Sequence, residues 1–392
     1  MDSIYLDAAA TAKYTNVDDI IVDTMVTAMR DSWMNPSSLY ATNVRNKIDK
    51  CRANIAKFIG ARADEIYFTS GASESNNWAI KGWVEQVGED RFEKDMFDVS
   101  IPYIFTTPIE HKSILSVLDS DTLHCFRHIC AVDSNGVIIL DLLENPLKTY
   151  EGENILVTIH MANNELGVIQ PIKQISELVH KYGGVLHVDA TQALGHIPID
   201  VEELGVDMLS ASGHKISPVL RGIGFLYKRN GVNIKPLIYG TQENGMRGST
   251  ENTYGIIGLS KALEYCNTSI DSINRLSKKR DYFINRLVKE FGCIINGSLE
   301  SRLPNNINVA FPQNITGESL LYVLEMSGIQ VSTSSACNSR SIKKSHVLDA
   351  IGLTDEQAMK TVRFSLPSDI TYNEIDWVVE EIENALKIIQ LD

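Results

Sequence analysis

The sequence lacks the features that mark a membrane-bound or secreted protein. It has no apolar run of about 18 residues, the length a transmembrane helix needs, so no membrane span is predicted. Its first residues, MDSIYLDAAATAKY, lack the basic start and apolar stretch of a signal peptide. The six cysteines form no C-x-x-C pair, which argues against a zinc ribbon or disulfide scaffold and favours a reducing cytoplasm.

Positive charge is also scarce. Lys and Arg total 36 against 50 Asp and Glu, which gives a net charge of −14. A net negative charge of this size repels phosphate backbones and anionic membranes, so neither nucleic acid nor a membrane is expected as a direct partner. With 44% hydrophobic and 22% charged residues, the composition is typical of a soluble globular protein. At about 150 residues per domain, the length predicts two or three domains.

The first 250 residues or so alternate between helical and strand-like patterns. Helical spacing of apolar residues occurs at 18–30, 43–59 and 172–182, and a helical run from about 76 ends near Trp83. Short apolar runs that predict strands lie at 66–68, 103–106, 155–160, 185–188, 208–211 and 224–227. Strands that alternate with helices predict an α/β fold with a mostly parallel sheet. The polar stretch 85–98 is predicted to be a surface insertion.

The pattern changes after about residue 256. One long helix is predicted to residue 291, and a last helix at 372–390. Short strands are predicted between them at 307–311, 329–332 and 362–366. This part is interpreted as a second, smaller α/β domain. Because no Gly/Ser-rich or Pro-rich linker precedes it, we expect the two domains to pack tightly.

A lysine and an acid follow two strands of the predicted sheet. Lys215 ends the segment LSASGHK, and Asp189 ends the apolar strand VLHVD. Adjacent parallel strands would bring both to one crevice, where open α/β sheets bind ligands. A desolvated lysine amine can form a Schiff base with an aldehyde cofactor, and an acid can keep a pyridinium nitrogen protonated. A solvated loop lysine and a helix-capping aspartate are the alternatives.

Three further segments are expected at that crevice. Residues 69–75 run from a strand through Gly71 to a helix start, which suits a phosphate, and no P-loop motif G-x-x-x-x-G-K-[ST] competes with it. An ordinary helix cap is the compatible alternative. His111 and Asn163 also follow strands, where they could contact an aromatic cofactor. A metal site is the remaining alternative, built from His111, His187, Asp189 and His214, although no H-E-x-x-H spacing supports it.

One cysteine stands in the small polar segment STSSACNSRS. Such surroundings suit a mobile, reactive thiol, although an incidental cysteine in a Ser-rich loop is the alternative for Cys337. Downstream, Arg363 lies within an apolar strand pattern. A partly buried arginine there would bind either a substrate carboxylate or a structural acid.

Taken together, these segments resemble the NifS/IscS-type cysteine desulfurases, pyridoxal phosphate (PLP) enzymes of the class V aminotransferase group. The likeness runs in order along the chain and rests on YLD (5–7), FTSGASES (68–75), EHK (110–112), NNELG (163–167), HVDATQ (187–192), SGHK (212–215), GMR (245–247), SAC (335–337) and RFSL (363–366). It implies PLP fold type I, with a large domain at 14–256 that holds a seven-stranded-type sheet. It also implies a small domain formed by 1–13 and 257–392, which carries Cys337 and Arg363.

The resemblance also assigns roles to individual residues. Lys215 would carry the Schiff base, Asp189 would pair with the ring nitrogen, and His111 would stack on the ring. The other cofactor contacts implied are Ala72, Ser73, Asn163, Gln192, Ser212, His214 and, from the other subunit of a homodimer, Thr250. Asn163 and Arg363 would hold the substrate carboxylate. Cys337 would take the sulfur, and with Lys215 and His111 it completes the implied catalytic set.

The implied reaction removes sulfur from L-cysteine, leaving L-alanine and a persulfide on Cys337 for transfer to an acceptor protein. A selenocysteine lyase or another class V aminotransferase is the alternative enzyme, and a partner-binding scaffold the non-enzymatic one. The sequence departs from the family pattern at Ala12, Ser73, Gly248–Thr250 and the loop 216–221. It also ends without the C-terminal extension on which housekeeping members dock their iron–sulfur scaffold, so the pathway that the sulfur supplies stays open.

Overall fold

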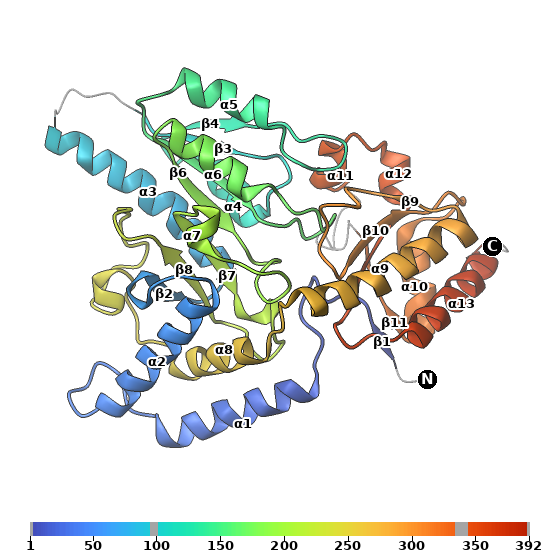
Figure 1. The fold of residues 1–392 in the computed structure, drawn as a ribbon, viewed down its shortest axis with the longest axis horizontal. Helices are drawn as coiled ribbons and strands as arrows, with labels where there is room; N and C mark the ends of the chain where they lie inside the picture. The colour runs from blue at the N-terminus through green and yellow to red at the C-terminus, as the bar shows by residue number, and fades with distance from the viewer. Residues whose placement is uncertain (1–2, 95–100, 334–343, 390–392) are drawn as a thin grey trace.

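The computed structural model describes residues 3–94, 101–333 and 344–389. Its largest sheet has seven strands in the order β2-β8-β7-β6-β5-β3-β4 (Figure 1). They are β2 (Ile66–Thr69), β3 (Tyr103–Thr106), β4 (Phe126–Ile129), β5 (Ile155–His160), β6 (Val185–Asp189), β7 (Met208–Ser212) and β8 (Gly224–Lys228). Strand β8 runs antiparallel to both of its neighbours, and the other pairs are parallel. The expected α/β fold with a mostly parallel sheet is confirmed.

Helices cover both faces of this sheet. Successive side chains of a strand point to opposite faces, so Ile104 and Leu156 enter one core while Phe105 and Val157 enter another. Helices α3 (Ala72–Lys94) and α4 (Lys112–Leu118) cover the first face. The second is covered by α2 (Thr42–Phe58), α5 (Leu140–Thr149), α6 (Ile172–Lys181) and α7 (Val201–Leu204). Helix α8 (Thr253–Tyr265) packs between α2 and α1 (Asn16–Asp31).

The C-terminal third forms a separate core together with the first residues of the chain. A four-stranded sheet has the order β12-β13-β10-β9, and β1 pairs with β11 (Figure 1). These strands are β1 (Ile4–Tyr5), β9 (Ile294–Ile295), β10 (Asn306–Ala310), β11 (Ile329–Gln330), β12 (Ser332–Thr333) and β13 (Thr361–Ser365). The helices are α9 (Ile270–Phe291), α10 (Gly317–Met326), α11 (His346–Ala350), α12 (Asp355–Met359) and α13 (Tyr372–Ile389). Leu6, Phe283 and Phe364 lie in this core.

One predicted helix was wrong, and another continues further than predicted. The single helix predicted up to residue 291 is broken at residues 266–269, where Ser269 caps a new helix by accepting a hydrogen bond from the Ser272 amide. The expected insertion 85–98 is, up to Lys94, a continuation of α3, and residues 95–100 lie outside the described ranges. No helix in the described ranges has the length and apolar character needed to cross a membrane.

Candidate active site

The two residues at the centre of the prediction lie at one edge of the large sheet. Strands β6 and β7 are adjacent and parallel, and Asp189 at the end of β6 is in register with Ser210. Strand β7 continues directly into a single 3₁₀ turn, η2 (Gly213–Lys215), that ends on Lys215. The structure therefore brings Asp189 and Lys215 to the same carboxyl edge, where open α/β sheets bind ligands.

Asp189 is held on both of its oxygens. Oδ1 accepts hydrogen bonds from the backbone amide of Thr191, at 2.9 Å, and from the Thr191 hydroxyl. Oδ2 accepts one from the Asn76 side-chain amide at 2.7 Å. The side chain is buried, with 5% of the residue exposed. A buried carboxylate held in this way is suited to face a pyridinium N–H, which is the chemistry expected of it.

The N-terminal segment covers Lys215. The Lys215 amine donates hydrogen bonds to the carbonyls of Ala9 and Ala10, both at 2.7 Å. The carbonyl of Ala9 also accepts from the Gln192 amide at 3.0 Å. The Thr11 hydroxyl lies 3.1 Å from Nδ1 of His214. The N-terminal residues 9–11 therefore form one wall of the site, although they lie far from Lys215 in sequence. The segment around Lys215 gave no signal that these two carbonyls would contact it.

The proposed phosphate cradle is formed by Gly71, the start of α3 and Ser212. Gly71 has φ +152°, and a Cβ added there would come 3.5 Å from the Ser212 hydroxyl. Helix α3 begins at once with Ala72 and Ser73, so its first amides lie beside that hydroxyl. The space that a side chain at 71 would fill, with an acid and an amine along the same edge, fits the phosphate, ring and aldehyde of PLP.

Two histidines of the site are expected to be neutral. Burial, with the nearby charges of Lys215 and Arg221, lowers the pKa of His214 to about 4. Burial also lowers the pKa of His111, an effect that Asp189 opposes and Lys215 reinforces. His111 caps α4, because its Nδ1 accepts a hydrogen bond from the Ser113 amide at 3.1 Å. His111 is connected to Asp189 through Asn76, which bonds both Asp189 and Ser113, and through the Ser113 hydroxyl, 2.8 Å from Nδ1 of His111.

The two predicted substrate-binding residues have structural partners. Asn163 Oδ1 accepts hydrogen bonds from the amides of Glu165 and Leu166, and Nδ2 donates to the Ile109 carbonyl. Arg363 donates to Asp7 at 2.5 Å and to the Asn164 carbonyl at 3.0 Å, so the structural ion pair considered from sequence is present. The buried Arg363 Nε has no hydrogen-bond partner among the described residues. Beyond these bonds, Asn163 keeps one N–H and Arg363 keeps three N–H groups, Nε–H among them, that could bind a ligand.

The alternative metal site receives no support. His187 lies between Thr158, 2.7 Å from Nδ1, and Ser210, 2.9 Å from Nε2. Burial lowers the pKa of His187 to about 4. Across the three described ranges, no three His, Cys, Asp or Glu side chains gather as metal ligands.

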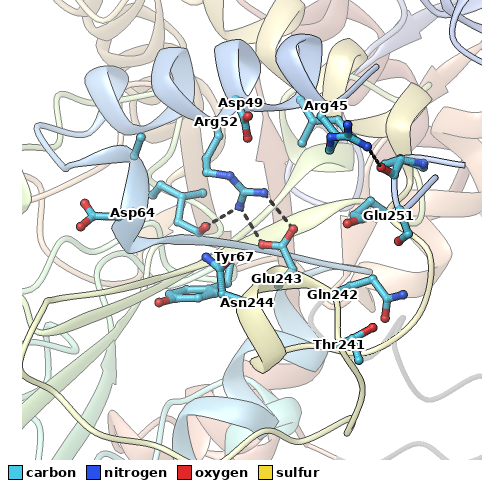
Figure 2. Close-up of a pocket in the computed structure, with 15 residues that line it drawn as sticks. Arg45, Asp49, Arg52, Asp64, Tyr67, Thr241, Gln242, Glu243, Asn244 and Glu251 are labelled. Carbon is cyan, nitrogen blue, oxygen red and sulfur yellow. Dashed lines mark hydrogen bonds and ion pairs between the residues drawn. The ribbon is translucent and has the colours of Figure 1, made fainter. Parts of the chain in front are cut away.

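The loop that carries Thr250 is tied by two ion pairs to α2 and α3, the helices on opposite faces of the large sheet. Arg52 donates to both oxygens of the buried Glu243 carboxylate, at 2.7 and 2.9 Å, as Figure 2 shows. Arg247 pairs with Glu74 in the first turn of α3, at 2.8 and 3.1 Å. Thr250 itself is exposed. The loop is therefore anchored beside the proposed phosphate cradle, and the reach of Thr250 into a second subunit stays a prediction.

The unusual order Gly248-Ser249 in this loop has a structural reason and a cost. A Cβ at position 248 would lie 2.2 Å from the Tyr239 carbonyl, so only glycine fits there, while Ser249 takes φ +88°. We expect Ser249→Gly to stabilise the protein by about 1 kcal/mol. Relief of roughly 1–3 kcal/mol of backbone strain exceeds the roughly 0.5–1 kcal/mol that glycine's flexibility costs. Thermal unfolding measures the difference. Gly248→Ala is the control and should lower the unfolding midpoint, because its Cβ would clash with the Tyr239 carbonyl. A lower unfolding midpoint for Ser249→Gly would contradict this account.

The remaining catalytic prediction, Cys337, lies outside the described residues, as do Ser335 and Ala336. Two residues of the site were missed from sequence. Asn76 contacts both Asp189 and Ser113, and Ser113 contacts His111. Asn76 lies near the start of α3 and Ser113 near the start of α4, and this position after a predicted ligand loop was the only signal for them in the sequence.

Comparison with known proteins decides the family. The family model described as Aminotransferase class-V matches residues 4–378. The chain is 39% identical to "Cysteine desulfurase IscS" of Dictyoglomus turgidum, over 98% of this chain and 94% of that one. It is 40% identical to the protein of the same name from Methanosarcina thermophila, over 98% and 92%. The chain belongs to the class V aminotransferase family, among its IscS- and NifS-like cysteine desulfurases.

Solved structures agree with this assignment. A structure titled "NIFS-LIKE PROTEIN" superposes with a TM-score of 0.86 at 35% identity, covering 98% of this chain and all of the other. A structure titled "SspA in complex with cysteine" gives 0.78 at 33% identity, over 93% and 99%. The fold shared with these two structures agrees with the family that the sequence comparisons show.

Proposed function

We propose that the protein is a PLP-dependent cysteine desulfurase that converts L-cysteine to L-alanine and passes the sulfur to Cys337. The observation that carries this proposal is the placement of Asp189 and Lys215 at adjacent strand ends, with the Gly71–Ser212 cradle along the same edge. When bound, PLP would supply an electron sink for the carbanion formed at the substrate's α-carbon.

The residues of the chain would divide the work as follows. Asp189 would pair with the ring nitrogen, Ser212 and the first turn of α3 with Ala72 and Ser73 would hold the phosphate, and Gln192 would contact the ring hydroxyl. The Lys215 amine, which now donates to the carbonyls of Ala9 and Ala10, would hold the cofactor aldehyde. Once the substrate amine has replaced it there, the freed Lys215 amine would accept the α-proton. His214 adds a further phosphate contact.

Substrate would be held at the opposite end of the site. The remaining donors of Asn163 and Arg363 bind its carboxylate, with Asp7 keeping the guanidinium in place. The Cys337 thiolate would attack the substrate sulfur, so that the carbon–sulfur bond breaks as the sulfur–sulfur bond forms. The electron pair of the broken bond would stay on the β-carbon, which takes up a proton to become the methyl group of alanine. His111 would contact the sulfur at which the thiol proton is lost or gained.

Several broader features belong to the same proposal. We infer a cytoplasmic homodimer in which Thr250 completes the partner's phosphate site, and an acceptor protein that receives the persulfide sulfur. The large domain would comprise 14–256 and the small domain 1–13 with 257–392. If the hydrophobic cores define the domains, the boundary moves beyond α8, since Leu259 and Leu263 lie in the core of the large sheet.

A direct experiment separates this function from its neighbours. Purified protein is loaded with PLP, mixed with L-cysteine and a thiol reductant, and assayed for alanine, sulfide and keto acid. We expect alanine and sulfide in equal amounts. An aminotransferase would give keto acid, a selenocysteine lyase would act on selenocysteine alone, and a scaffold would show no absorbance change with PLP.

Thiol reactivity offers an independent check on the sulfur acceptor. Burial raises the pKa of Cys51 and Cys125, and raises that of Cys130, Cys266 and Cys293 to about 12. These five thiols should therefore react slowly with iodoacetamide near neutral pH, because the thiolate is the nucleophile. We expect the first equivalent of label on Cys337, located by peptide mass spectrometry. Equally rapid labelling of Cys125 would contradict this expectation.

A further inference from the structure

A line of hydrogen bonds joins Asp189 to His111 through two residues without an assigned role. Asn76 Nδ2 donates to Asp189 Oδ2 at 2.7 Å and to the Ser113 hydroxyl at 2.9 Å. That hydroxyl lies 2.8 Å from His111 Nδ1, and the Ser113 backbone amide donates to the same nitrogen at 3.1 Å. The line crosses from β6 through α3 to the start of α4, so it joins three separate elements.

The chemistry of the groups fixes the direction of each bond. A carboxylate only accepts, so the Asn76 amide must turn its nitrogen toward Asp189. Its second hydrogen then points to the Ser113 oxygen, which leaves the hydroxyl hydrogen for His111 Nδ1. The Ser113 backbone N–H can only donate. His111 Nδ1 is therefore an acceptor twice over, and the ring proton must sit on Nε2.

The line is maintained at some expense to stability. Asn76 is fully buried, and its Oδ1 has no hydrogen-bond partner within the described residues. A buried acceptor without a partner is unfavourable, and an apolar side chain would remove that penalty. An apolar side chain, however, could not orient Asp189 and Ser113 by hydrogen bonds as Asn76 does.

We propose that Asn76 and Ser113 are positioning residues that fix His111 as the neutral Nε2–H tautomer, so that His111 serves the reaction as a hydrogen-bond donor and not as a base. This inference rests on the proposed desulfurase function and makes its role for His111 specific. To act as a base through Nδ1, the ring would have to break both bonds from Ser113. The Nε2–H is instead available to a developing negative charge, such as a thiolate sulfur.

The electrostatic surroundings of His111 agree with a neutral ring. Burial is the largest influence and lowers the pKa of His111. Asp189 on β6 and the adjacent Glu110 raise it, while Lys215 in η2 and His346 in α11 lower it, and the balance is a lowered pKa. The neutral form is thus favoured by burial as well as by the bonds from Ser113.

Ring-carbon NMR shifts of 13C-labelled histidine test the tautomer directly, in full-length protein with and without PLP. The His111 signal among the nine histidines is identified by its loss in His111→Gln. We expect the Nε2–H form, neutral across the neutral pH range. Ser113→Ala should move the titration midpoint of His111 upward, because one bond to Nδ1 is lost. Ser113→Thr, which keeps the hydroxyl, should restore it, and Ser120→Ala just beyond α4 should change nothing.

A kinetic pair tests the donor role. Glutamine offers an N–H donor but no base, so His111→Gln should stay within about tenfold of the parent kcat, while His111→Ala should lose about 100-fold or more. Three results would each overturn the inference. They are a ring proton on Nδ1 of His111 in the unmodified protein, an equal loss of kcat in both His111 variants, and an unchanged His111 titration midpoint in Ser113→Ala. The NMR readings do not depend on turnover. Absence of alanine formation with the Nε2–H form intact would therefore count against the proposed function alone.

Discussion

Lys215→Ala is expected to reduce alanine formation from L-cysteine by about 10⁴-fold, the upper end of what one positioned acid–base group contributes. The substitution removes both the amine that would hold the cofactor aldehyde and the group that would move the α-proton. The phosphate cradle and Asp189 remain, so PLP should still bind, without the absorbance band of a lysine Schiff base. Spectra and alanine assays on the same preparation measure both effects.

Lys13→Ala is the matched control for this change. Lys13 and Lys215 both line one cavity of the structure. The Lys13 amine, however, pairs with the Asp369 carboxylate at the surface, 2.9 Å away. Exposed ion pairs contribute little, so its loss should leave activity intact. Added primary amines should restore part of the activity of Lys215→Ala alone. Comparable losses in both lysine variants would show that Lys215 has no special role.

Cys337→Ser is expected to lower sulfide and alanine formation by roughly 10³-fold or more, because a hydroxyl cannot replace a thiolate as the sulfur nucleophile. The change leaves the cofactor site untouched. L-Cysteine should still bind and change the cofactor absorbance at its normal affinity. The loss should therefore appear in kcat, with the dissociation constant for cysteine unchanged.

Cys125→Ser provides the comparison for the thiol. Cys125 is half-buried in the described structure and belongs to the hydrophobic core on the α3 side of the large sheet. Its replacement should not alter the rate beyond a small effect on stability. If Cys337→Ser kept full sulfide release, the sulfur would reach its acceptor by another route, and the role assigned to Cys337 would be wrong.

Much of the large sheet could be predicted from sequence because its strands are buried on both faces. Residues 155–160 are buried throughout and mostly apolar, and the boundaries predicted for this run agree with β5. Strand β4 was missed because all four of its residues are exposed, so it shows no apolar pattern. The C-terminal half of α3 was missed for a similar reason, since its amphipathic pattern ends before the helix does.

The site residues that could be predicted from sequence are those that lie at or just after the ends of strands. Asp189, Lys215 and His111 each follow a strand, and parallel topology brings strand ends together. The contacts that hold them come from distant residues with no chemical motif. Asn76 meets Asp189 across 113 positions, and the Ala9 carbonyl meets Lys215 across 206. Such pairs depend on packing, which a single sequence does not display.

The broken helix near residue 266 illustrates a signal that was present but weak. Ser269 followed by Asp271 is a helix start, yet the apolar spacing of both neighbouring helices continues across the junction. A prediction from apolar spacing alone therefore joins the two helices into one. In the structure α8 packs with α1, while α9 lies on the C-terminal core.

The fate of the substrate's sulfur tests the central claim most directly. The PLP-loaded protein is mixed with 34S-labelled L-cysteine without reductant, stopped, digested and measured by mass spectrometry, with alanine counted in the same sample. We predict one labelled sulfur added to the peptide that contains Cys337 for each alanine formed in the first turnover. Label on another cysteine, or label without alanine, would contradict the account.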